Sequence, residues 1–216
     1  DDGLPNFALS TLEFAYRNVT NKTVSGIRAG STTACIVYVT EGGVLHSANL
    51  GDSGYMVLRN DEIIYRSKEL QHRFNAPYQI AVCPPERNGT CIMNEPKDAA
   101  LHKMQLKNGD MIIIGTDGLF DNMYDSHIAQ LVKKTREDVL PSLPTDPSMS
   151  RLAIQQRNNF EIAKNLCLYA KTIAHTQSPY NRTPFGDAYQ NETGKTYGSG
   201  GKIDDITCVV CTVNQV

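Results

Sequence analysis

The order of hydrophobic and polar residues predicts a helix near the start of the chain and a series of short strands after it. Residues 7–19 have helical spacing, with an apolar face made of Ala8, Leu12, Ala15, Tyr16 and Val19. Short apolar runs follow at residues 35–39, 44–50, 55–58 and 63–65, with turn-forming residues between them. Because short connections join neighbouring antiparallel strands, these runs predict two β-hairpins.

A third hairpin is expected around Asn108-Gly109, a dipeptide that favours tight turns. The strand after it, residues 111–114, is a continuous apolar run, which is typical of a strand buried on both faces. The strand before it is expected at residues 104–106.

Asp117 lies directly after this buried strand, next to Gly118, and Asp121 follows four residues later. A carboxylate at the end of a buried strand needs a partner that neutralises it, and a divalent cation is one solution. An aspartate beside a glycine is also an ordinary turn residue. The motif alone therefore leaves both interpretations open.

The second half of the chain predicts helices and one final strand. Asp125 or Ser126 can cap a helix that carries Ile128, Leu131 and Val132. Residues 149–175 keep helical spacing, with apolar positions at Phe160, Ala163, Leu166, Cys167, Ala170, Ile173 and Ala174. The last strand is expected at residues 207–213. Hairpins flanked by helices, without strand–helix alternation, predict a single α+β domain over residues 1–216.

Composition narrows the classes of function. The chain has 216 residues, 40% of them hydrophobic, which is enough for a sizeable core. A net charge of −2 gives no indication of a nucleic acid or an anionic membrane as partner. No apolar run approaches the roughly 20 residues that span a bilayer. Most of the six cysteines lie in apolar strand or helix patterns, so we expect free thiols and a reducing compartment.

Acidic residues recur at predicted strand ends. Asp52 lies between two expected strands, and Asp204 and Asp205 come directly before the last one. Together with Asp117 and Asp121 they can converge in the folded chain. Hard oxygen ligands without a His/Cys cluster favour magnesium or manganese over zinc.

Four segments of the chain, in this order, resemble the metal-dependent protein serine/threonine phosphatases of type 2C. They are Gly-Ser-Thr-Thr-Ala at residues 30–34, Asn-Leu-Gly-Asp-Ser at 49–53, Thr-Asp-Gly-Leu-Phe-Asp-Asn at 116–122 and Asp-Asp-Ile-Thr at 204–207. A fifth segment, Phe-Asn-Ala-Pro-Tyr-Gln at residues 74–79, is similar to the mitochondrial branch of that family. The resemblance implies two antiparallel sheets packed as a sandwich between helices, and a location in the mitochondrial matrix.

The resemblance also implies roles for particular residues. Asp117 and Asp204 match the carboxylates that hold the more buried metal and carry catalysis, and Asp52 and Asp121 match positions that help to bind a weaker metal. Two or more Mg²⁺ or Mn²⁺ ions would activate a bridging water for attack on phosphoserine or phosphothreonine in a protein substrate. Asp205 is expected to have a supporting role at most.

One motif of the family has no counterpart here. It is an upstream Asp-Gly followed by further glycines, whose aspartate bridges the metals. Asp2-Gly3 lies too close to the first predicted helix to be this motif. We therefore expect either an N-terminally truncated chain or a variant without the bridge. Two hypotheses follow: a protein phosphatase, or a non-catalytic relative that binds phosphoproteins or other partners.

Overall fold

A computed structural model describes residues 6–21, 26–87, 89–143, 146–176, 178, 180–198 and 200–214. The chain divides into two compact units, whose positions relative to one another are not determined. Unit 1 contains the described residues up to Gly54 and Ser67–Lys107, and unit 2 contains Tyr55–Arg66 and Asn108–Asn214. Asp2 and Gly3 lie outside the described residues. The single domain expected from the sequence stays a prediction.

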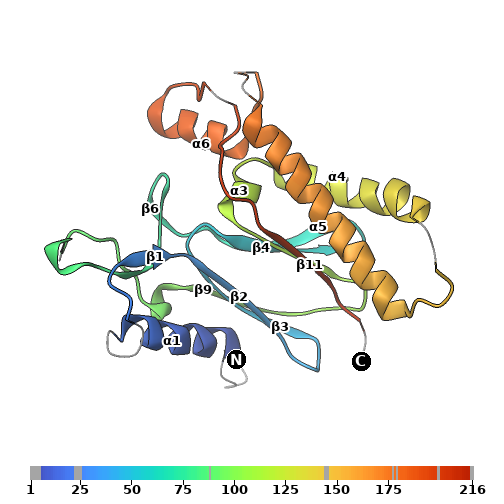
Figure 1. The fold of residues 1–216 in the computed structure, drawn as a ribbon, viewed down its shortest axis with the longest axis horizontal. Coiled ribbons are helices and arrows are strands. Elements are labelled where there is room, and N and C mark those ends of the chain that lie inside the picture. Colours follow the sequence, from blue (N-terminus) through green and yellow to red (C-terminus); the bar gives the residue numbers. More distant parts are fainter. Residues whose placement is uncertain are drawn as a thin grey trace. The chain divides into compact units, whose positions relative to one another are not determined.

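Unit 1 is built on a three-stranded antiparallel sheet covered by one helix. Its sheet has the order β2-β3-β9, with β2 at Ala34–Val39, β3 at Val44–Leu50 and β9 at Ala100–Gln105. The helix α1 (Phe7–Thr20) lies along β2 and β3 (Figure 1). Two residues of its predicted apolar face, Ala8 and Leu12, are buried there in a cluster with Ala48, Leu50 and Ile80, and Tyr16 and Val19 pack against it partly buried. Ala15, also expected on this face, is exposed.

Two smaller ladders complete unit 1. They pair β1 (Gly30–Thr32) with β8 (Ile80–Val82) and β6 (Gln71–Arg73) with β7 (Ala76–Pro77). Short 3₁₀ turns follow at Pro85–Arg87 and Pro96–Asp98. The described residues of the segment 71–96, which has no clear periodicity in the sequence, thus form short strands and turns.

Unit 2 is built on a four-stranded sheet with the order β11-β10-β4-β5. Its strands are β4 (Gly54–Arg59), β5 (Glu62–Arg66), β10 (Met111–Gly115) and β11 (Cys208–Thr212). The helices are α3 (Asp117–Phe120), α4 (Asp125–Lys134), α5 (Arg151–His175) and α6 (Pro184–Thr193), with a π-helical turn at Thr135–Val139 and a 3₁₀ turn at Leu140–Ser142. Helices and antiparallel strands in both units confirm the α+β class.

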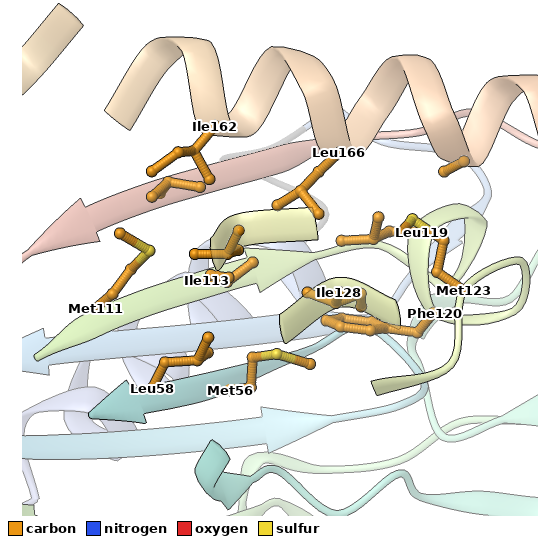
Figure 2. Close-up of a cluster of buried hydrophobic side chains, with 13 residues drawn as sticks. Met56, Leu58, Met111, Ile113, Leu119, Phe120, Met123, Ile128, Ile162 and Leu166 are labelled. Atoms are coloured by element: carbon orange, nitrogen blue, oxygen red, sulfur yellow. The ribbon is translucent and has the colours of Figure 1, made fainter. Parts of the chain in front are cut away.

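The core of unit 2 lies between this sheet and helix α5. Figure 2 shows side chains of α5 and of strands β4 and β10 that point toward one another. The buried cluster consists of Met56, Leu58, Met111, Ile113, Leu119, Phe120, Met123, Ile128, Val132, Ile162, Leu166, Ala170 and Val210. Ile113 is fully buried, as the apolar run of β10 predicts. This packing fixes the end of β10, where Asp117 begins α3.

The hairpin predicted around Asn108-Gly109 is wrong. Strand β9 pairs with β3 in unit 1, whereas β10 pairs antiparallel with β11 in unit 2. Gly109 does turn the chain, with φ 88°, but its N–H donates to the carbonyl of Val213. The two strands also differ in burial, since β9 alternates and β10 is almost wholly buried. A local turn signal therefore did not decide which strands pair.

Three helix details differ from the sequence-based expectation. Neither Asp125 nor Ser126 caps α4, because the N-cap residue is Tyr124. Phe160 is 64% exposed, although its spacing predicted a place in the apolar face of α5. Helix α6 was not predicted, despite a Thr183 cap, a proline at its first position and a left-handed Gly194 at its end.

The cysteines also differ in part from expectation. Cys83 and Cys91 form a disulfide, so the expectation of free thiols is wrong for this pair. The other four, at positions 35, 167, 208 and 211, are not part of a disulfide. Within the part of the chain that the structure describes, no helix has the length and apolar character needed to cross a membrane.

Helix α5 begins at a side-chain cap that can be tested. The Ser150 hydroxyl accepts a hydrogen bond from the Ala153 N–H at 3.2 Å. Ser150→Ala is expected to lower the free energy of unfolding by about 1 kcal/mol, because that N–H loses its partner. Ser126→Ala is the matched control, since Ser126 is exposed in the first turn of α4 without capping it. Urea unfolding of both variants measures the difference, and equal stabilities would contradict the capping role.

Candidate functional site

Asp117 is positioned by the end of strand β10. The strand stops at Gly115, Thr116 has extended backbone angles, and α3 begins at Asp117 itself. One carboxylate oxygen, Oδ1, accepts a hydrogen bond from the N–H of Gly118 at 2.9 Å. This bond fixes the side chain and leaves Oδ2 directed at another group.

That group is the ammonium of Lys202, which lies at the centre of a cluster of carboxylates. Its Nζ is 2.8 Å from Asp117 Oδ2, 2.6 Å from Asp121 Oδ2 and 3.3 Å from Asp204 Oδ2. The Lys202 side chain is only 15% exposed, and those of the three aspartates are between 24% and 35% exposed. Three of the four predicted metal ligands are therefore brought together in unit 2.

The loop that carries Lys202 and Asp204 is tied to α3 by the side chain of Asn122. This buried amide donates to the carbonyls of Gly118 (2.9 Å) and Lys202 (2.8 Å) and accepts from the Lys202 N–H (2.9 Å). Thr116 makes a second tie, because its hydroxyl donates to the Asp205 carbonyl at 3.1 Å and accepts from the Thr207 N–H at 3.1 Å. The loop is thus held at both ends.

Gly118 lets the same loop approach α3 closely. A Cβ atom added at Gly118 would overlap the carbonyl oxygen of Asp205. A glycine is therefore needed where the two segments meet, and this explains the Asp-Gly pair at the start of α3. Asp205 contributes its backbone carbonyl to this junction, and its expected supporting role in the site stays a prediction.

The charges of the cluster shift the protonation of Lys202. Burial disfavours the ammonium, but the attraction of Asp121 and the hydrogen bonds to Asp117 and Asp121 outweigh this and raise the pKa of Lys202. The ammonium also lies 5.0 Å from the centroid of the Phe185 ring, a favourable cation–π distance. Lys202 is therefore charged at neutral pH.

Asp52 lies in unit 1, in the turn after β3. The turn is joined to the predicted Gly-Ser-Thr-Thr-Ala motif, because the hydroxyls of Ser53 and Thr33 are 3.0 Å apart. Gly51, with φ 112°, packs against Thr33 and Tyr78 where a side chain would collide. Since the two units are described separately, the expectation that Asp52 joins the other three aspartates stays a prediction.

The donor set has the chemistry that a divalent cation prefers, namely carboxylate oxygens without sulfur or imidazole. The arrangement shows one obstacle. The oxygens that would bind the ion surround the Lys202 ammonium instead. Among the described residues, no group of three or more His, Cys, Asp or Glu side chains is placed to hold a metal ion. The chemical type of these ligands suits a divalent cation, but the cation can bind only if the Lys202 ammonium leaves the centre of the cluster.

Two residues of this site were not predicted. Lys202 stands beside the Asp204-Asp205 pair in the sequence, and Asn122 ends the segment 116–122, yet neither was given a role. The signal for Lys202 is a single lysine among acidic residues that are expected to converge. Asn122 has only the weak signal of a polar residue directly after a buried helical turn.

Solved structures of two phosphatases share this fold. The photosystem II phosphatase PBCP superposes with a TM-score of 0.66 over 97% of this chain and 79% of its own, at 23% identity. The catalytic domain of the serine/threonine phosphatase PstP, solved with two manganese ions, has a TM-score of 0.51 over 99% and 75%, at 17% identity. The fold is that of the 2C-type phosphatases.

Sequence comparison finds relatives of higher identity. Proteins named protein phosphatase PTC7 homolog are 37% identical over 187 residues in Homo sapiens, 36% over 187 in Danio rerio and 35% over 216 in Xenopus laevis. These matches cover 86%, 86% and 98% of this chain, but 55%, 56% and 64% of the relatives. The chain is thus similar to proteins named protein phosphatases, and it spans between 55% and 64% of the length of these relatives. No family model matches it.

Proposed function

We propose that the protein is a metal-dependent protein serine/threonine phosphatase that uses Mg²⁺ or Mn²⁺. The observation that carries this proposal is the convergence of Asp117, Asp121 and Asp204 on one cationic group, in the fold of 2C-type phosphatases. Relatives named protein phosphatases at 34–37% identity support it. Nothing found favours the alternative of a non-catalytic binding module.

In this proposal Asp117, Asp121 and Asp204 would hold a metal ion, and a metal-binding role for Asp52 stays a prediction. The bound ions would supply an activated water for attack on the phosphorus of phosphoserine or phosphothreonine. The chain itself orients these carboxylates. Gly118 N–H fixes Asp117, Asn122 fixes the loop of Asp204, and both act through hydrogen bonds that are already formed. Preorganised ligands of this kind reduce the cost of arranging the site during reaction.

The test is hydrolysis of an aryl phosphate and of phosphoserine, phosphothreonine and phosphotyrosine peptides by the complete protein. Activity is expected with added Mn²⁺ or Mg²⁺, to be lost after chelation, and to favour the phosphoserine and phosphothreonine peptides over phosphotyrosine. Activity that persists after exhaustive chelation would refute the metal mechanism. Binding of phosphopeptides without any hydrolysis at saturating metal would support the binding module instead.

A location in the mitochondrial matrix is part of the same proposal. It is supported by the similarity of residues 74–79 to the mitochondrial branch of the family. Fractionation of cells that express the complete protein, with protease protection of isolated mitochondria, tests it. Recovery in another compartment would reject this part without affecting the proposed chemistry.

A further inference from the structure

Lys202 occupies the position at which the carboxylates of unit 2 converge. We propose that Lys202 is an internal counter-ion, which holds the metal-free site together and must leave before a divalent cation can bind. The identity of the competing ion rests on the proposed function. The competition itself rests on the geometry of Lys202, Asp117 and Asp121.

Distances make the two cations mutually exclusive. The Lys202 Nζ is 2.8 Å from Asp117 Oδ2 and 2.6 Å from Asp121 Oδ2. A Mg²⁺ ion that uses these oxygens lies about 2.1 Å from each of them, which is within the space that the ammonium fills. Two positive charges at such separation repel strongly in a site that is largely shielded from water. Binding of the metal therefore requires Lys202 to move.

The charge balance explains why the protein keeps a cation here in the absence of metal. Asp117, Asp121 and Asp204 contribute three negative charges at close range, and Lys202 neutralises one of them. Without it, the carboxylates would repel one another, and a metal ion that replaces the ammonium relieves the same repulsion. The ammonium keeps the ligands gathered and at the same time lowers their apparent affinity for the metal.

Only the side chain of Lys202 has to move. Its backbone N–H and carbonyl are both bonded to the buried amide of Asn122. The ammonium, in contrast, ends a flexible four-carbon stem with rotatable donors. The ligand loop can therefore stay in place while the ammonium is exchanged for the metal.

A Mn²⁺ titration of the metal-stripped complete protein by calorimetry tests this competition. Lys202→Gln should bind Mn²⁺ with a dissociation constant about ten- to a hundredfold lower than the wild type, since charge-assisted hydrogen bonds no longer have to break. The matched control is Lys195→Gln, because Lys195 is exposed after α6, away from the carboxylate cluster, and its backbone N–H donates to the Thr193 hydroxyl. Its affinity should equal that of the wild type.

Equal or weaker Mn²⁺ binding by Lys202→Gln would overturn the proposal, and so would the absence of Mn²⁺ binding by both wild type and variant. Neither result depends on phosphatase activity. Failure of the proposed function, which is measured by hydrolysis, is therefore distinguishable from failure of the counter-ion role.

A measurement on the wild type covers the case in which Lys202→Gln fails to fold. Amine acetylation of the native protein, read by mass spectrometry, should leave Lys202 protected without metal and labelled when Mn²⁺ is saturating. Lys195 should be labelled equally in both conditions. Protection of Lys202 that is unchanged by saturating Mn²⁺ would show that the ammonium does not leave, and would overturn the proposal.

Discussion

Asp117→Asn in the complete protein is expected to reduce turnover on the order of a thousandfold, the scale of losing a principal electrostatic element of a site. The substitution changes little else. The amide carbonyl still accepts the Gly118 N–H that Oδ1 accepts now, so the start of α3 is preserved. The other oxygen, which lies 2.8 Å from Lys202 Nζ, is lost as an anionic ligand.

The measurement is kcat at saturating Mn²⁺, with circular dichroism to confirm folding. Asp205→Asn is the matched control, because Asp205 is exposed and joins the site through its backbone carbonyl. It should retain turnover within a few-fold of the wild type. Near-normal turnover of a folded Asp117→Asn protein would mean that this aspartate is a turn residue and not a metal ligand.

Asn122→Ala is expected to lower the free energy of unfolding by about 2–4 kcal/mol. The buried amide makes three hydrogen bonds, each worth about 1 kcal/mol, and its removal leaves the Lys202 N–H and two carbonyls without this partner. Since the same bonds hold the loop that carries Asp204, metal affinity should fall as well.

Urea unfolding in the absence of metal gives the change in stability, and a Mn²⁺ titration gives the change in affinity. Asn191→Ala is the matched control, because Asn191 is exposed on α6 and no bond of its side chain supports the site. It should leave both quantities close to those of the wild type. An Asn122→Ala protein with unchanged stability would show that the loop is held by other contacts.

Helices and strands that are determined by the pattern of neighbouring residues could be predicted from the sequence. Strand β3 was expected at residues 44–50 and is found at Val44–Leu50, and α1 differs from its expected range by one residue. The first apolar residues of the α1 face, Ala8 and Leu12, are buried, and β3 is buried from Leu45 to Leu50. Helix α6 was missed because Phe185 is its only buried residue, so it has almost no apolar stripe.

Elements that depend on a distant partner could not be predicted. The turn at Asn108-Gly109 is local, but pairing of β9 with β3 depends on a strand more than fifty residues earlier. The residues of the candidate site also differ in how far the sequence could predict them. Asp117, Asp121 and Asp204 could be proposed as site residues because they lie in segments that resemble the 2C-type phosphatases, whereas the role of Lys202 follows from the three carboxylates around it.

The candidate site also has a consequence for the order of events during protein synthesis. Lys202 follows Asp117 by 85 positions and Asp121 by 81 positions in the sequence. At roughly 5–20 residues per second, a ribosome needs roughly 4–17 s to extend the chain from the aspartates to their lysine. Strand β11, the edge neighbour of β10, is made later still. The carboxylates of the nascent chain therefore remain solvated until Lys202 has been synthesised. Assembly of the site is a late step of folding, because it joins residues that are far apart in the sequence.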